Sequence, residues 1–174
     1  MDQKKKSASG RFARECIVDA LLVLTKEKPL SAITVSELCD RAGVSRMTFY
    51  RNYASKEEVF SSRLLELLEE YGKEETEDQK NGNYFDKNHM IHCFQYWFRY
   101  RDFFDSLIHC GFGNIFIESL MRFILKKWSY ETEQERLHLI SFTGSIISLY
   151  IAWADGGYRE SIEDLASVLD ELYR

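Results

Sequence analysis

One short stretch of the sequence gathers residue types that bind nucleic acid. The segment CDRAGVSRMTFYRNYASKEEVF, residues 39–60, holds Arg41, Arg46, Arg51 and Lys56 among hydroxyl and aromatic side chains. Basic and hydroxyl groups bind phosphates, and arginine can also read base edges in the major groove. The chain as a whole is acidic, with a formal net charge of -5, but its first 60 residues contain eleven Lys and Arg against eight Asp and Glu. The basic character is therefore local and indicates a DNA-binding surface.

The elements expected around this stretch have the layout of a helix-turn-helix. The TVSE pattern from Thr34 to Glu37 is a capping box that begins a short helix, and Gly43 should end that helix in a left-handed conformation. After a turn of AGV, Ser45 can cap the next helix. A short helix that follows a tight turn fits the major groove of DNA. We therefore expect the helix over 45–53 to be the recognition helix.

A helical wheel separates two faces of this recognition helix. Val44, Phe49 and Tyr53 fall inward with Leu38 of the preceding helix. The side chains expected to face DNA or its edges are Arg46, Met47, Thr48, Tyr50, Arg51 and Asn52. Lys56 begins the next helix, where an ammonium and the helix amides can meet one phosphate.

The segment ITVSELCDRAGVSRMTFYRNYASKEEVF resembles the DNA-binding segment of the TetR family of bacterial transcriptional regulators, over about residues 11–68. The resemblance implies phosphate contacts for Thr34, Thr48, Tyr50 and Lys56, and places Ser45, Arg46 and Met47 near bases. Asn52 stands where the family often has histidine, and Met47 where it often has a small residue. The base preference of relatives is therefore not carried over to this chain.

The remaining pattern predicts helices only, since the chain has one proline, nine glycines and little turn punctuation. We expect about nine helices, over residues 9–26, 34–42, 45–53, 55–71, 86–101, 103–110, 114–128, 132–155 and 161–172. The first has an apolar stripe of Ile17, Ala20, Leu21 and Leu24, and the helix over 132–155 begins with a TEQE capping box from Thr132 to Glu135. The fold class is all-α: a three-helix DNA-binding domain over 1–54, with a flexible basic arm over 1–8, and a helical dimerisation and regulatory bundle over 55–174. The polar stretch over 72–83 is the expected loop between two halves.

The C-terminal part is rich in aromatic residues. Eighteen of the 25 aromatic residues of the chain lie between Tyr84 and Tyr158. One interpretation is a pocket for a small apolar or aromatic effector, lined by Phe94, Trp97, Phe98, Phe104, Phe116 and Tyr150. The other is a tightly packed aromatic core. The acidic run from Glu74 to Asp78 reads as solvated surface.

The segment Leu137–Ala154 has 18 residues without a formal charge, which is near the length of a membrane span. Serine, threonine and histidine dilute its apolar character, so we interpret it as a buried helix. Small residues at helical spacing would let a helix of a second copy approach closely. The expected dimer interface contains Gly144, Ser145, Ser148, Ile151 and Ala152, with Leu165 and Leu169 of the last helix.

Other classes of site find little support. His89, His92 and Cys93 share a helix face and suggest a metal sensor, but single buried His and Cys residues usually just pack, so we expect no metal and no cofactor. Four widely spaced cysteines and the lack of a secretory signal indicate a cytoplasmic protein. No catalytic motif stands out, so we expect no enzyme.

The sequence therefore predicts a TetR-like regulator, by default a repressor, that binds a palindromic operator as a homodimer and responds to a ligand. The alternative is a coactivator whose helical domain docks a protein partner. The region SLYIAWADGGY supports this alternative, because it resembles a subgroup of short regulators, some of which are suspected activators that act with a protein partner.

Overall fold

The computed structural model describes the backbone of residues 2–76 and 82–173, and the side chains from Gly10 onward within those ranges. The described residues form nine α-helices and one 3-10 helix and contain no strand. The predicted all-α fold is confirmed. The chain divides into two compact units, Met1–Glu66 and Leu67–Arg174. The functional division expected after residue 54 stays a prediction.

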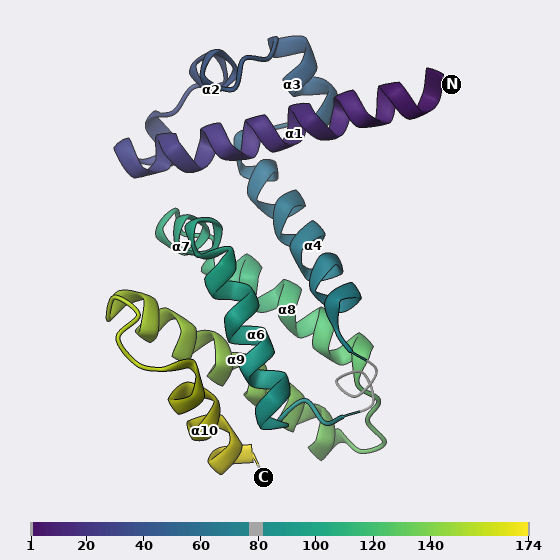
Figure 1. The fold of residues 1–174 in the computed structure, drawn as a ribbon, viewed down its shortest axis with the longest axis vertical. Helices are drawn as coiled ribbons and strands as arrows, with labels where there is room; N and C mark the ends of the chain where they lie inside the picture. Colours follow the sequence, from purple (N-terminus) through teal and green to yellow (C-terminus); the bar gives the residue numbers. More distant parts are fainter. Residues whose placement is uncertain (1, 77–81, 174) are drawn as a thin grey trace. The chain divides into compact units, whose positions relative to one another are not determined.

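The first unit contains α1 (Asp2–Glu27), η1 (Leu30–Ala32), α2 (Val35–Ala42), α3 (Arg46–Asn52) and the beginning of α4 (Lys56–Glu74). Both α2 and α3 pack against α1 (Figure 1). The predicted apolar stripe of α1 is buried: Ile17, Ala20, Leu21 and Leu24 are each at most 5% exposed. The backbone of α1 begins at Asp2, earlier than the expected Ser9, and includes residues 2–8 of the expected arm.

Local capping explains where α2 begins and ends. The Thr34 hydroxyl accepts from the backbone N–H of Glu37 at 3.2 Å, as predicted. The Glu37 carboxylate does not complete the expected capping box; it accepts instead from Lys28 Nζ at 2.5 Å. Gly43 ends the helix with φ of 66°, a left-handed conformation that glycine adopts without steric strain.

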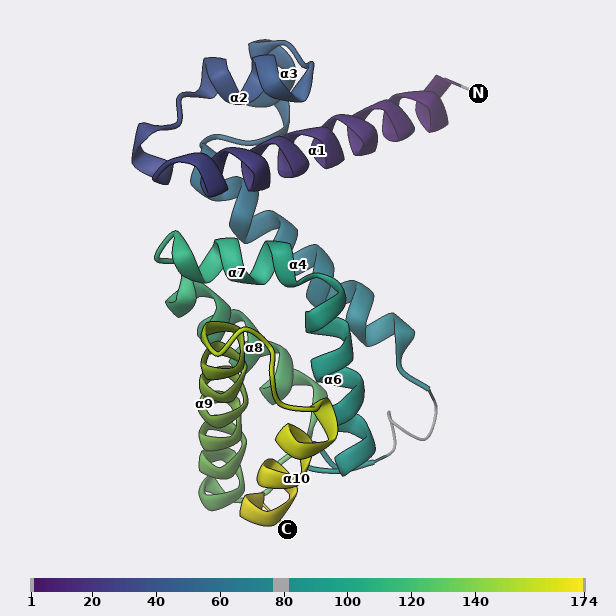
Figure 2. The ribbon, with the colours of Figure 1, turned by 60° about the vertical axis from the view of Figure 1, so that its left-hand side comes forward.

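The second unit contains α6 (Lys87–Arg99), α7 (Arg101–His109), α8 (Gly113–Lys127), α9 (Glu133–Asp155) and α10 (Ile162–Tyr173). Figure 2 shows α8, α9, α6 and α10 gathered in one bundle, in which α8 packs on α9 and α10 packs on α6. The predicted capping box of α9, between Thr132 and Glu135, is complete in both directions. Of the expected loop over 72–83, residues 77–81 lie outside the described part of the chain.

The break between α6 and α7 falls at Tyr100, not at Asp102 as expected. Asp102 lies in the first turn of α7. A carboxylate is favourable there, because it faces the positive end of the helix dipole. The acidic residue therefore stabilises the first turn of the new helix instead of interrupting the chain.

Helix α9 is long and apolar enough, by length and composition alone, to cross a membrane. Leu139, Ile146, Tyr150 and Trp153 are buried on one side of it. A core helix of a soluble protein passes the same test, so this single helix is weak evidence for a membrane span. In the most apolar 18-residue window of α9, 39% of the window is buried. The other side of the helix is therefore uncovered in the single chain.

Candidate nucleic-acid interface and effector cavity

Helix α3, the expected recognition helix, has only seven residues and depends on its first cap. Ser45 Oγ accepts from the backbone N–H of Thr48 at 3.0 Å, and the two hydroxyl groups lie 2.9 Å apart. An isolated helix of this length is marginal in water, so the cap and the contacts of its buried face must hold it. The cap expected from the sequence is present.

The two faces of α3 differ sharply in exposure. Phe49 is fully buried and Tyr53 is 3% exposed, and their ring centroids lie 5.9 Å apart. On the other side Met47 is 71% exposed and Tyr50 is 51% exposed. Arg46 and Arg51 are exposed as well, and Val44 is half-buried. Basic, aromatic and apolar side chains therefore lie together on the exposed face of α3.

Two other expected DNA-contacting residues have intramolecular roles. Asn52 Nδ2 donates to the carbonyl oxygen of Thr48 at 2.7 Å, so part of its amide serves the last turn of α3. Thr34 is exposed, and its hydroxyl caps α2. Both side chains keep acceptor capacity for a further contact.

Lys56 has a structural role that the sequence did not indicate. Its Nζ donates to the carbonyl oxygens of Leu30 and Ile33, each at 2.6 Å, and the residue is half-buried. An ammonium has three N–H donors, so one remains for a phosphate. No sequence signal points to this role, because the acceptors are main-chain oxygens of a segment more than twenty residues away.

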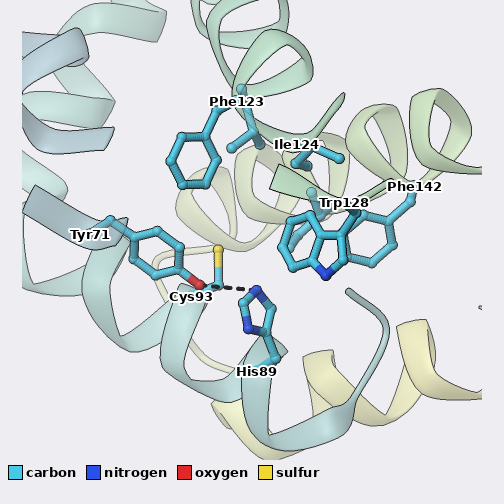
Figure 3. A pocket seen from close by; sticks show the side chains of 9 residues that line it. Tyr71, His89, Cys93, Phe123, Ile124, Trp128 and Phe142 are labelled. Atoms are coloured by element: carbon cyan, nitrogen blue, oxygen red, sulfur yellow. Dashed lines mark hydrogen bonds between the residues drawn. The ribbon is translucent and has the colours of Figure 1, made fainter. Parts of the chain in front are cut away.

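A small cavity lies in the second unit, between α4, α6, α8 and α9 (Figure 3). Its volume is about 20 Å³. Its walls are Tyr71, His89, Cys93, Leu120, Phe123, Ile124, Trp128, Phe142 and Ile146. A volume of this size holds about one water molecule.

None of the six residues expected to line an effector pocket touches this cavity. Phe94, Trp97, Phe104, Phe116 and Tyr150 are each at most 1% exposed. Their rings fill the space instead: Trp97 lies 5.2 Å from Phe116 and 5.4 Å from Tyr150, both nearly edge to face. Phe98 packs on the rings of Trp153 and Tyr158. In this structure these residues pack as an aromatic core, as in the second interpretation, with the edge-to-face and tilted ring contacts typical of one.

The polar groups beside the cavity form a buried cluster. Tyr71 Oη lies 3.2 Å from His89 Nε2, and His89 Nδ1 lies 3.7 Å from Glu75 Oε1. Glu75 is 5% exposed and forms an ion pair with Lys127. The expectation that the acidic run is solvated surface is therefore wrong for Glu75. A run of consecutive charged residues in the sequence does not indicate which of them is buried.

Burial lowers the pKa of His89 to about 3, and the nearby charge of Lys127 adds to this effect. The imidazole is therefore neutral at neutral pH. Burial also raises the pKa of Tyr71 well above its ordinary value, so the phenol keeps its proton. Among the described residues, no group of three or more His, Cys, Asp or Glu lies close enough to hold a metal ion. His92 instead stacks on Tyr71, with the ring centroids 5.2 Å apart.

The expected dimer residues fall into two groups. Ser148 and Ala152 are exposed, and Gly144, Ser145 and Ile151 are half-buried. Leu165 and Leu169 are 5% and 1% exposed, so they are buried within the single chain and are not free for a partner. The apolar stripe of α10 packs within the single chain, and not at the dimer interface that the sequence predicts. A stripe indicates that a helix face is buried, but it does not indicate which residues cover that face.

The same two helices also carry exposed apolar residues: Leu137, Val168 and Leu172 are 52%, 47% and 68% exposed. They lie on α9 and α10, which pack against each other within the bundle. Isolated exposed leucines are common on protein surfaces, but several on two neighbouring helices are more typical of a protein contact.

Comparison with known proteins gives one family match, which lies in the first unit. Residues 17–62 match the family model described as bacterial regulatory proteins, tetR family. This match spans the second part of α1, η1, α2, α3 and the beginning of α4. No curated protein sequence matches the chain.

Solved structures share the fold of almost the whole chain. A TetR transcriptional regulator from Streptococcus agalactiae 2603V has a TM-score of 0.68 at 18% identity, with 99% of each chain covered. A TetR transcriptional regulator from Rhodococcus sp. RHA1 has a TM-score of 0.57 at 17% identity, with 94% of each covered. A tetR-family regulator from Streptomyces coelicolor has a TM-score of 0.59 at 15% identity, with 92% of this chain and 78% of that chain covered.

Proposed function

We propose that this chain, a TetR-family transcriptional regulator by its residues 17–62 and its fold, is a repressor that binds a palindromic operator as a homodimer. One observation carries the proposal. The capped helix α3 buries Phe49 and Tyr53 and leaves Arg46, Met47 and Tyr50 exposed on its other side. Regulators of this family bind DNA and are not enzymes, so we assign no catalytic activity.

The proposed contacts divide into two kinds. Thr34, Thr48, Tyr50 and the remaining N–H of Lys56 bind phosphates, which fix the register of the protein on DNA. Ser45, Arg46 and Met47 lie at bases, with Arg51 and Asn52 at the edge of the contact. An arginine that donates to guanine O6 and N7 reads one base pair, and a methionine can contact a thymine methyl.

Dimerisation follows from the size of one recognition helix. A helix of seven residues covers too few base pairs for specific binding, so two copies must lie about 34–36 Å apart, or a multiple of this distance, on a two-fold axis. We assign the interface to the exposed side of α9, with Ser148 and Ala152, and to Leu172 of α10. Gly144, Ser145 and Ile151 are its half-buried members.

We assign the response to an effector to the second unit. We place the protein in the cytoplasm. The second candidate, a coactivator that docks a protein partner, is favoured by one observation on the described part of the second unit. The cavity lined by Tyr71, His89 and Trp128 has a volume of about 20 Å³, too small for a drug-sized effector, since ordinary ligand pockets are roughly 300–1,000 Å³. A protein effector would need no cavity.

A gel shift with DNA from upstream of the gene for this chain separates the two candidates. A repressor shifts this DNA alone. A coactivator shifts it, or activates transcription from it, only when the protein encoded by the neighbouring gene is added. If neither condition shifts the DNA and random DNA binds equally well, the proposed operator function is wrong.

A further inference from the structure

The side chain of Lys127 occupies a site that is built like a receptor for an organic cation. Its ammonium forms an ion pair with Glu75, whose side chain is 2% exposed. The same nitrogen lies 4.3 Å from the ring centroid of Trp128 and 6.0 Å from those of Tyr71 and Phe123. Aromatic faces within about 6 Å attract a cation, most strongly when it is removed from water.

The cation site adjoins the cavity, because three rings belong to both. Tyr71, Phe123 and Trp128 line the cavity, as Figure 3 shows. The same three rings lie within 6.0 Å of the Lys127 ammonium. Lys127 is the last residue of α8, and its side chain is 15% exposed, so its stem reaches the surface. If the Lys127 side chain turns outward, the space that it leaves joins the cavity into one apolar site with a carboxylate at its side.

The charges of the site select a cation over an anion. Glu75 is a buried carboxylate, and its described ion-pair partner of fixed charge is Lys127. His89 is neutral, since its pKa is about 3. Its Nδ1 has no hydrogen-bond partner among the described residues and lies 3.7 Å from Glu75 Oε1. Without Lys127, an anion would meet an uncompensated negative charge, whereas a cation would replace the charge that was lost.

We propose that this site, the Glu75 cage formed by Glu75, Tyr71, Phe123 and Trp128, binds a small primary amine with an alkyl tail about as long as the lysine side chain. The ligand ammonium donates to Glu75 in place of Lys127, and its tail takes the space that the Lys127 stem leaves. In the absence of ligand, Lys127 fills the cage from within the chain. If the chain is the proposed regulator, this amine is its effector, so the regulatory role rests on the proposed function. Amine binding itself requires no DNA.

A chemical rescue tests the cage. Lys127→Ala removes three carbons and the ammonium, and leaves Glu75 buried without its partner. The melting temperature should fall by more than in Lys126→Ala, which removes the same charge from an exposed neighbour on α8. Propylamine, which is protonated at pH 7, supplies the missing atoms. It should raise the melting temperature of Lys127→Ala above the effect of equal NaCl, and should not do so for Lys126→Ala.

The wild-type chain gives a second test that needs no stable Lys127 variant. Butylamine, which has the four carbons and the ammonium of a lysine side chain, should bind to it in calorimetry, and pentanoate, which has a carboxylate in place of the amine, should not. Glu75→Gln should weaken butylamine binding by about tenfold or more, which corresponds to about 1.4 kcal/mol.

The proposal is overturned if propylamine and NaCl raise the melting temperature of Lys127→Ala equally, or if butylamine does not bind the wild-type chain. Binding of butylamine and pentanoate with equal affinity also overturns it, since the cage would then not select charge. DNA binding is measured separately with the unliganded chain. A chain that binds amines but not DNA contradicts the proposed regulator and leaves the Glu75 cage supported.

Discussion

The ammonium of Lys56 donates to the main-chain oxygen of Ile33 at 2.6 Å. Ile33 is 1% exposed and directly precedes Thr34, the cap of α2, while Lys56 is the first residue of α4. A second bond of equal length joins Lys56 to Leu30 in η1. The lysine therefore connects the segment before the helix-turn-helix to the helix after it, and any phosphate contact uses a side chain whose position is already fixed.

Lys56→Met should reduce both stability and DNA binding. The substitution keeps an apolar stem but leaves the oxygens of Leu30 and Ile33 without their donor. Hydrogen bonds to charged groups contribute about 1.5–3 kcal/mol each, so we expect a loss of at least that order in the free energy of unfolding. Urea denaturation measures it. Lys73→Met is the matched control on α4, because Lys73 is 75% exposed and its ion pair with Glu69 is worth little. A Lys56→Met chain as stable as this control would show that the two bonds contribute nothing.

Arg46 and Tyr50 should differ in how their loss affects binding. Tyr50→Ala should weaken binding to operator and random DNA alike, because a phosphate contact carries no sequence information. Arg46→Ala should cost about 1–3 kcal/mol on the operator and relax the preference at one base pair. Fluorescence anisotropy with operator variants measures both. Equal losses on operator and random DNA for Arg46→Ala would exclude a base-reading role for this arginine.

Ser148→Arg should separate the dimer. Ser148 is exposed on the uncovered side of α9, and an arginine there would bury an unpaired charge in a two-fold interface. Sedimentation should show a monomer with unchanged helical content, and operator binding should be lost. Ser129→Arg, at an exposed position after α8, is the control and should stay dimeric. A Ser148→Arg chain that sediments as a dimer and binds operator normally would place the interface elsewhere.

Acid should destabilise the second unit through His89. Burial lowers the pKa of His89 in the folded chain from 6.5 to about 3. Between these values the unfolded chain binds a proton that the folded chain does not, so stability is lost as the pH falls below about 6.5. The loss from this group can reach about 1.4 kcal/mol per pH unit. His89→Gln should flatten the pH dependence of the free energy of unfolding between pH 6.5 and 4, whereas His138→Gln, at an exposed position, should not. The same slope in His89→Gln and the wild-type chain would assign the acid sensitivity to other groups.

The helices could be predicted from the sequence because their signals are local. Thr132 and Glu135 form the expected capping box, and Gly43 ends α2 in the expected left-handed conformation. The stripe from Ile17 to Leu24 is buried as expected. Caps and apolar spacing act over a few residues, so they can be read directly from the chain.

The site in the second unit could not be predicted, because it depends on partners far apart in the sequence. Glu75 and Lys127 are 52 residues apart and form a buried pair. Leu165 and Leu169 were expected at a dimer interface, but they are buried within the chain. Aromatic content likewise predicted a pocket where Trp97, Phe116 and Tyr150 fill a core. Sequence patterns indicate that such side chains are buried. Which residues they pack against depends on the tertiary structure.

Selection of binding sites from random duplex DNA with the full chain measures sequence-specific binding and two-fold symmetry in one experiment. A dimeric, sequence-specific regulator should enrich a palindrome whose half-sites lie one helical turn or a multiple of it apart, with one guanine in each half-site that Arg46→Ala no longer selects. Recovery of no enriched sequence, or of a single site without two-fold symmetry, would show that the chain is not such a regulator.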